Sequence, residues 1–365
     1  MLDRRIFKEI DWTTILLMVV ISVIGIIFVH SAIYSQSSKY VWKQSVWLLV
    51  SLLALLILLV IDYKVLLSFA FPFYILMNLI LAGLLIFGKP VANTRSWLVF
   101  GPFQFQPSEL TKVAVILLLA RLFSDYKEDQ MSFKAFFLSS ALVGLPFVLI
   151  ALQPDLGTAL TLVPVLLGTY ILAGLPRRYL VVILIVSCLV GFIGWNYGLK
   201  DYQKKRIETL LVPDQDPRGA GYQLKQSRIA LGSGGLTGKG YHKGTQSQLR
   251  FLPARHNDFI LAVIGEDLGF LGILAVFLIY FIFLFRLFSA VQVSPDRGGV
   301  YIAFLSAMLI GCQFMINIMM IVGLFPITGI PIPFLSYGGS SLLTNFLIAG
   351  LVINVKMRRF AYIRF

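Results

Sequence analysis

A carboxylate at the edge of an apolar run is the feature of this sequence that most suggests chemistry. Asp258 ends the segment FLPARHND (residues 251–258), and a long apolar run begins at Phe259. Ionisable groups are costly at the edge of a membrane span and usually mark a functional site. Arg255 precedes Asp258 by three residues, and a carboxylate held beside cations is suited to act as a general base. Alternatively, Asp258 only caps the helix that follows.

Two further acidic side chains lie at the ends of apolar runs. Glu109 and Lys112 are three residues apart in QPSELTK (residues 106–112), so they share one face of a helix and can form an ion pair. Such a pair can hold the end of a span in place, or Lys112 can meet an anionic ligand. Asp155 lies in QPDLGT (residues 153–158), where it can cap the next helix or belong to a site. The sequence alone leaves these alternatives open.

An apolar segment near the C-terminus is repeatedly interrupted by proline and glycine. It reads FPITGIPIPFLSYGGSS (residues 325–341), and proline at this density prevents a continuous helix. Non-helical backbone persists at membrane depth only against protein or a water-filled cavity. We therefore expect a re-entrant or interfacial segment that brings Ser336 and Ser340 to a polar pocket.

A glycine-rich segment, LGSGGLTGKG (residues 231–240), looks like a phosphate-binding loop but is not a Walker A motif. Ser233 stands where the first glycine belongs, and Gly240 follows Lys239 in place of serine or threonine. Its backbone amides could cradle a pyrophosphate, but a flexible loop is the favoured interpretation.

The elements that must position these residues are membrane helices. The 365 residues are 58% hydrophobic, and repeated apolar runs approach the roughly 20 residues that cross a bilayer as a helix. The predicted fold class is an all-α polytopic membrane protein, with residues 1–365 forming a single integral membrane domain of about ten spans. The expected spans are 12–33, 46–61, 66–87, 108–123, 135–152, 157–175, 179–197, 259–287, 299–323 and 340–356.

The distribution of basic residues predicts the orientation, because cytoplasmic segments near span ends are enriched in Lys and Arg. With the N-terminus inside, fifteen such residues lie inside and four lie in short outer segments. Both termini are then cytoplasmic, and residues 199–258 form a large outer loop. The inner residues are Arg4, Arg5, Lys8, Lys64, Arg121, Lys127, Lys134, Arg177, Arg178, Arg286, Arg297, Lys356, Arg358, Arg359 and Arg364, and the outer ones are Lys39, Lys43, Lys89 and Arg95.

The net charge of +14 favours anionic partners. Because the charges lie between spans, lipid headgroups, pyrophosphates and cell-wall polymers are favoured over nucleic acid, and no nucleic-acid partner is expected.

Four separated segments, in order, resemble the SEDS family (shape, elongation, division and sporulation). They are QPSE (106–109), QPDLGT (153–158), FLPARHND with GEDLG (251–258 and 265–269), and PIPFLSYGGSS (331–341). Within the family, DPRGAGYQ (216–223) and GTQSQL (244–249) are closer to the elongation members than to the division members. The resemblance covers the whole chain. It departs at Asp267, where glutamate is expected after Glu266.

The resemblance implies a peptidoglycan glycosyltransferase that polymerises lipid II at the outer face of the bacterial cytoplasmic membrane, for cell elongation and shape. It implies two kinds of partner, a class B penicillin-binding protein that crosslinks the product and other membrane proteins of the elongation complex. The family's essential outer-loop acid falls on Asp258, its Glu–Lys pair on Glu109 and Lys112, and its Gln-Pro-Asp acid on Asp155.

The chemistry of such a transfer assigns provisional roles. A sugar hydroxyl is a poor nucleophile, so Asp258 would take its proton as it attacks the anomeric carbon, and a single displacement inverts that centre. The polyprenyl pyrophosphate that leaves is already a stable anion and needs cations more than a general acid. Lys112, Arg255 or a divalent ion (Mg²⁺ or Mn²⁺) near Asp258 or Asp155 would supply them, with no organic cofactor.

Two other functions stay open at this point. A flippase for the same lipid-linked precursor predicts polar residues throughout the bilayer depth, whereas here they cluster at outer span ends. A non-catalytic scaffold for wall-synthesis partners predicts that Asp258 is dispensable.

Overall fold

The computed structural model describes residues 8–33, 39–88, 94–101, 103–126, 128, 130–212, 216 and 219–360. Several residues used in the sequence analysis lie outside the described ones: Arg4, Arg5, Lys89, Lys127, Pro217, Arg218 and Arg364.

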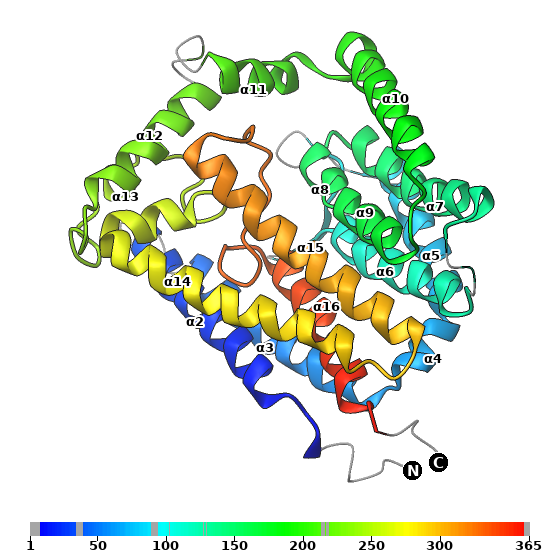
Figure 1. Cartoon of the computed structure of the whole chain (residues 1–365). Coiled ribbons are helices and arrows are strands. Elements are labelled where there is room, and N and C mark those ends of the chain that lie inside the picture. The colour runs from blue at the N-terminus through cyan, green and yellow to red at the C-terminus, as the bar shows by residue number, and fades with distance from the viewer. Residues whose placement is uncertain are drawn as a thin grey trace.

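Each of the ten expected spans corresponds to one helix or to two consecutive helices (Figure 1). Eight helices among the described residues are long and apolar enough to cross a membrane on their own. The all-α, multi-pass membrane fold is therefore confirmed. The spans are α2 (Trp12–Ile33), α3 (Lys39–Val60), α4 with α5 (Tyr63–Ser68, Ala70–Phe87), α6 (Pro107–Ser124), α7 (Phe133–Leu152), α8 with α9 (Leu156–Leu160, Leu162–Leu172), α10 (Arg177–Ile193), α14 (Ile260–Gln292), α15 (Arg297–Val322) and α16 (Gly339–Met357).

The centre of the bundle is formed by α16 and α6. Helix α16 packs against α3, α15, α6 and α14, and most of its side chains are buried, as are those of α6. Helix α10 stands apart from this centre (Figure 1), and nearly all its described side chains are exposed. Because those side chains are apolar, α10 is suited to be surrounded by lipid.

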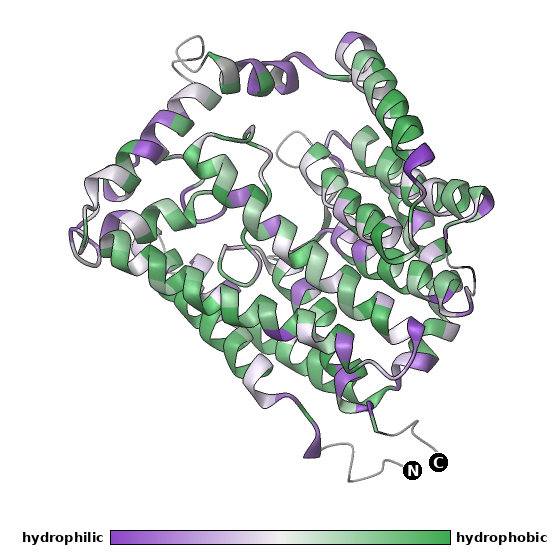
Figure 2. Cartoon of the chain, viewed as in Figure 1, coloured by the Kyte–Doolittle hydropathy of each residue, from purple (hydrophilic) through white to green (hydrophobic). Residues whose placement is uncertain are grey.

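Ion pairs join several helix ends at one end of the bundle. The Asp11 carboxylate, just before α2, contacts Arg286 of α14 at 2.5 Å and Lys356 of α16 at 2.6 Å. Hydrophilic residues mark this end and also the opposite one, where residues 199–258 lie (Figure 2). Arg286 and Lys356, two of the predicted inner basic residues, therefore lie at the end opposite residues 199–258.

Residues 199–258, which were expected to form a large outer loop, contain regular secondary structure. They contain α11 (Asp201–Leu211), α12 (Ala220–Ser233) and the short α13 (Thr245–Gln248), and they follow a π-helical turn, η1 (Gly194–Gly198). Helix α12 packs on α14 and α15 and buries Leu224, Ser227 and Ala230. Tertiary burial, rather than local hydropathy, holds α12 in place.

The glycine-rich turn after α12 is docked on α14 rather than free. The backbone amides of Lys239 and Gly240 donate to the carbonyl oxygens of Glu266 and Asp267. Gly238 has a φ of +80°, and a Cβ there would lie 2.2 Å from the Asp267 carbonyl oxygen. Only glycine allows this approach, so the segment is a packing element and not a flexible loop.

The proline-rich segment before α16 interrupts the helical structure, as its proline and glycine content predicts. Between α15 and α16 the backbone is non-helical, and Phe334 packs edge-on against Phe283 of α14 and Phe346 of α16, both at 5.3 Å. The side-chain amide of Asn317 on α15 donates to the Ile330 carbonyl at 2.7 Å. Protein contacts thus satisfy backbone that lipid could not.

A small antiparallel hairpin lies at the same end as residues 199–258. Strand β1 (Leu98–Phe100) pairs with β2 (Phe103–Phe105), with Leu98 opposite Phe105. The chain enters α6 directly after β2, so the hairpin lies beside Glu109.

Candidate active site

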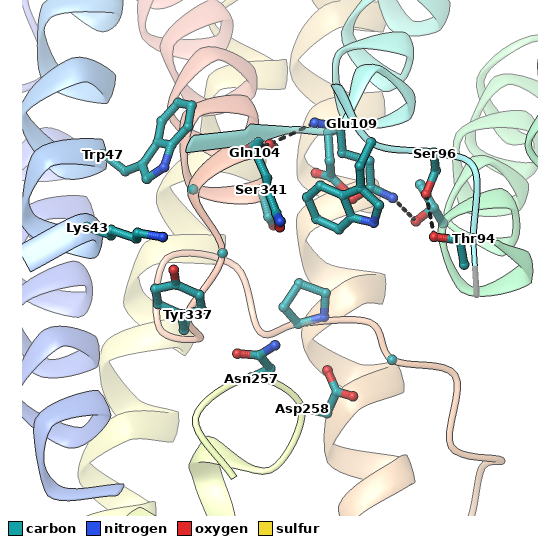
Figure 3. A pocket seen from close by; sticks show the side chains of 18 of the residues that line it. Lys43, Trp47, Thr94, Ser96, Gln104, Glu109, Asn257, Asp258, Tyr337 and Ser341 are labelled. Atoms are coloured by element: carbon teal, nitrogen blue, oxygen red, sulfur yellow. Dashed lines mark hydrogen bonds between the residues drawn. The ribbon is translucent and has the colours of Figure 1, made fainter. Parts of the chain in front are cut away.

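A cavity of about 610 Å³ lies at the end of the bundle that carries the hairpin and residues 199–258 (Figure 3). Its walls come from the start of α3, the hairpin region, the starts of α6 and α8, the end of the 199–258 segment, and residues 329–341. Four of the predicted site residues line it: Asp258, Asp155, Glu109 and Ser340. The fold therefore brings together side chains that are up to 231 positions apart in the sequence.

Asp258 projects its carboxyl group into the cavity (Figure 3). Its own carbonyl accepts from the Asn317 side chain at 3.0 Å, which fixes the backbone. The N-cap of α14 is Phe259, with no side-chain cap hydrogen bond, so Asp258 does not cap this helix. Burial raises the pKa of Asp258 to about 6, although the positive charge of Arg206 opposes the shift. A carboxylate with a pKa near neutrality is well matched to general base catalysis.

Asp155 does cap a helix, and it also lines the cavity. Its carboxylate accepts from the Thr158 backbone amide at 3.3 Å, at the start of α8, and from the Gln106 side-chain amide at 2.5 Å. Burial raises the pKa of Asp155, with a smaller contribution from the negative charge of Glu109. Gly157 permits α8 to approach closely, since a Cβ there would lie 2.2 Å from the Thr328 carbonyl oxygen.

Glu109 and Lys112 form the predicted ion pair. The Lys112 Nζ lies 2.7 Å from the Glu109 Oε2, and the two side chains are only 1% and 6% exposed, respectively. Glu109 lines the cavity, whereas Lys112 does not. The positive charge of Lys112 is therefore already neutralised by Glu109 on the same helix, without a ligand.

Arg255 and Ser336 lie outside the cavity lining and hold its walls. The Arg255 guanidinium is buried and donates to the Ala32 carbonyl at the end of α2. The Ser336 hydroxyl accepts from the Ile332 amide at 3.0 Å and tightens the re-entrant segment. Ser340 accepts from the Gln106 amide at 2.9 Å and so joins α16 to α6.

Three aromatic rings line the cavity together with Asp258, and two of them, Tyr40 and Tyr337, were not singled out from the sequence. The ring centroids of Tyr40 and His256 are 5.0 Å apart, those of Tyr40 and Tyr337 5.2 Å, and those of His256 and Tyr337 5.6 Å. Burial and the charge of Arg255 lower the pKa of His256 to about 4, so its imidazole is neutral at physiological pH. All three rings line the cavity.

Lys43 was counted only as an outer basic residue, yet its side chain projects into the cavity (Figure 3). The signal was present: Tyr40, Lys43, Gln44 and Trp47 follow the i, i+3, i+4, i+7 spacing of one helix face. It was hidden because the second span was expected to begin at residue 46, whereas α3 begins at Lys39. Contacts with the re-entrant segment extend the helix beyond its apolar part.

Together, the fold and the cavity define an integral membrane protein with a polar site at one end of its spans. Carboxylates and aromatic rings line the site, and the spans carry many exposed apolar side chains. Such a site suits an amphiphilic ligand whose head group lies at the interface while its tail remains in lipid.

Comparison with known proteins identifies the family. The profile described as "Cell cycle protein", for the FtsW, RodA and SpoVE proteins, matches residues 10–360. The chain belongs to this family, and the SEDS resemblance is confirmed.

Relatives and solved structures agree with this membership. The chain is 39% identical over 288 residues to the peptidoglycan glycosyltransferase MrdB of Escherichia coli K12, covering 78% of this chain and 77% of the relative. It is 34% identical to the probable peptidoglycan glycosyltransferase FtsW of Trichlorobacter lovleyi, covering 97% and 95%.

Two structures match over 96% of this chain and 98% of their own. One comes from a peptidoglycan synthase complex that coordinates polymerization and crosslinking, with a TM-score of 0.82 and 30% identity. The other is the rod shape determining protein RodA of Thermus thermophilus, with a TM-score of 0.73 and 28% identity.

Proposed function

We propose that this chain polymerises lipid II into glycan strands at the outer face of the bacterial cytoplasmic membrane, in support of cell elongation. Its family and the names of its relatives make it a peptidoglycan glycosyltransferase. The observation that carries the finer proposal is the cavity in which Asp258, Asp155 and Glu109 meet at one end of the spans. A lipid-linked sugar requires a site of this kind, because its tail stays in the bilayer.

Asp258 acts as the general base in this proposal. It accepts the proton of the acceptor hydroxyl while the hydroxyl oxygen forms a bond to the donor's anomeric carbon. The bond from that carbon to the diphosphate oxygen breaks, and polyprenyl diphosphate leaves with the electron pair. The anomeric centre inverts, and the proton on Asp258 passes to solvent. A pKa of about 6 leaves Asp258 mostly ionised at neutral pH.

The other predicted residues shape the cavity around this base. Asp155 and Gln106 join the starts of α8 and α6, and the Glu109–Lys112 pair fixes the first turns of α6. Arg255 and Ser336 hold the α2 end and the re-entrant segment, respectively. These contacts support positioning roles that place substrate against Asp258.

A divalent cation is compatible with the cavity. Among the described residues, no three His, Cys, Asp or Glu side chains form a metal-binding group. Mg²⁺, however, is commonly held by one or two carboxylates together with substrate phosphates, and Asp258 or Asp155 offers one carboxylate each. When bound, Mg²⁺ or Mn²⁺ would neutralise charge on the diphosphate.

The proposal includes orientation and partners. The distribution of basic residues supports cytoplasmic termini and an outer cavity. The similarity to a chain from a complex that couples polymerization with crosslinking supports a class B penicillin-binding protein as partner. Other elongation-complex membrane proteins are expected beside it.

The test is polymerisation in a defined system. Purified protein, its penicillin-binding partner and fluorescent lipid II should yield a ladder of glycan strands that a muramidase digests. The Asp258→Asn variant, folded to the same extent, should yield none. Transbilayer movement of lipid II in vesicles without any ladder would reject polymerisation in favour of a flippase.

A further inference from the structure

One face of helix α3 forms a wall of the cavity. Tyr40, Lys43 and Trp47 all line it, and Gln44 lies between them on the same face. This face is held on several sides. The Gln44 side chain donates to the Ser336 carbonyl and accepts from the Gly338 amide, both at 3.2 Å.

The aromatic members of the face are packed as well. Tyr40 packs against His256 and Tyr337. Trp47 lies so close to Gly339 that a Cβ there would be 2.1 Å from the indole Nε1. These contacts fix the first turns of α3 relative to the cavity.

Lys43 differs from its neighbours on this face. Its side chain is half-buried and directed into the cavity (Figure 3). Among the described lining residues, Lys43 is the one lysine or arginine, whereas Glu109, Asp155 and Asp258 are acidic. Lys112, the other lysine near the cavity, is already paired with Glu109. This wall thus presents one ammonium group to a cavity whose other charged lining side chains, among the described residues, are the three carboxylates.

We propose that Lys43 binds the diphosphate of the lipid-linked substrate and holds it across the cavity from Asp258, an inference that rests on the proposed function. A diphosphate entering beside three carboxylates needs a cation that is not already neutralised. The ammonium group is a compact charge with three donors on a flexible stem, and Lys43 can follow the diphosphate as it leaves. Lys43 is thus a binding residue, distinct from the base.

Binding can be measured apart from turnover in the Asp258→Asn background. Three probes are used: fluorescent lipid II, undecaprenyl diphosphate and undecaprenol. Loss of a charge-assisted hydrogen bond weakens binding about 10-fold or more. Lys43→Met should therefore bind both diphosphate lipids at least about 10-fold more weakly, and undecaprenol equally well. Lys43→Arg should regain most of the affinity, while Lys39→Met, one turn earlier on α3 and outside the lining, should bind as the parent does.

A second measurement needs no substitution. Acetylation of the Lys43 amine in the unsubstituted protein should slow when undecaprenyl diphosphate is added and not when undecaprenol is added. Lys39 is the internal control, since its acetylation rate should not change.

The outcomes separate this inference from the proposed function. Unchanged diphosphate affinity in Lys43→Met, or unprotected Lys43, overturns the inference. Weaker binding of lipid II with unchanged binding of undecaprenyl diphosphate overturns it as well, because Lys43 then contacts the sugar or peptide. If the unsubstituted protein binds both lipids through Lys43 yet forms no glycan, the diphosphate contact stands and the polymerase proposal fails.

Discussion

Replacing Asp258 by asparagine isolates the chemistry from the architecture. Asparagine keeps the side-chain volume, and the backbone contact with Asn317 is unaffected because Asp258 contributes its carbonyl oxygen. Asp258 caps no helix, so no cap is lost. Removing a general base costs about 10²- to 10⁴-fold in rate. We therefore expect Asp258→Asn to polymerise lipid II at least about 100-fold more slowly.

The same substitution should not destabilise the protein. Burial raises the pKa of Asp258 from 3.8 to about 6, so the folded state binds the proton more tightly than the unfolded state does. Stability contributed by the protonated form is present at low pH and is lost as the pH rises through about 6. Above pH 6, the buried carboxylate is ionised and lowers the free energy of unfolding by at most roughly 3 kcal/mol. The loss is smaller than this limit because the group faces a polar cavity. Asp258→Asn should thus have an equal or higher Tm at pH 7.5.

The assay pairs glycan synthesis with thermal unfolding in detergent. For the unsubstituted protein, kcat/KM should fall as the pH is lowered through about 6, because the base becomes protonated. A stable Asp258→Asn variant that polymerises at the normal rate would refute the assignment. So would activity that does not change between pH 5 and pH 8.

Three further predictions test the frame around the base. Glu109→Ala leaves the buried ammonium of its partner unpaired, so we expect a loss of about 3–5 kcal/mol and less folded protein in detergent. A variant that is fully stable but inactive would show instead that the pair acts on substrate. In intact spheroplasts, an impermeant maleimide should label Lys243→Cys but not Lys134→Cys. The opposite pattern would show that the true orientation is the reverse of the predicted one. Gly238→Ala should lower the Tm by several degrees, since its Cβ would meet the Asp267 carbonyl at 2.2 Å, whereas Gly232→Ala, with open space around it, should not; equal Tm values would mean that the docked turn is not rigid.

The sequence by itself determined the membrane class and the approximate spans. In a bilayer, the burial of an apolar run depends on its own length and composition, so no knowledge of neighbouring helices is needed. The ion pair of Glu109 and Lys112 was also predictable, because a spacing of three residues joins them on one helix. Asp258 was recognised for a similar local reason, a carboxylate at the start of an apolar run. Proline and glycine likewise marked the re-entrant segment.

Only the tertiary structure decided what these residues face. Asp155, Glu109 and Asp258 share one cavity because α6, α8 and the re-entrant segment pack together, and no local pattern specifies that packing. Arg255, expected near substrate, instead holds the end of α2. Lys43, which the sequence did not place in the site, lines the cavity. The direction of a long side chain is set by contacts with distant segments. Helix periodicity shows which residues share a face, but packing determines whether that face meets lipid, protein or the site.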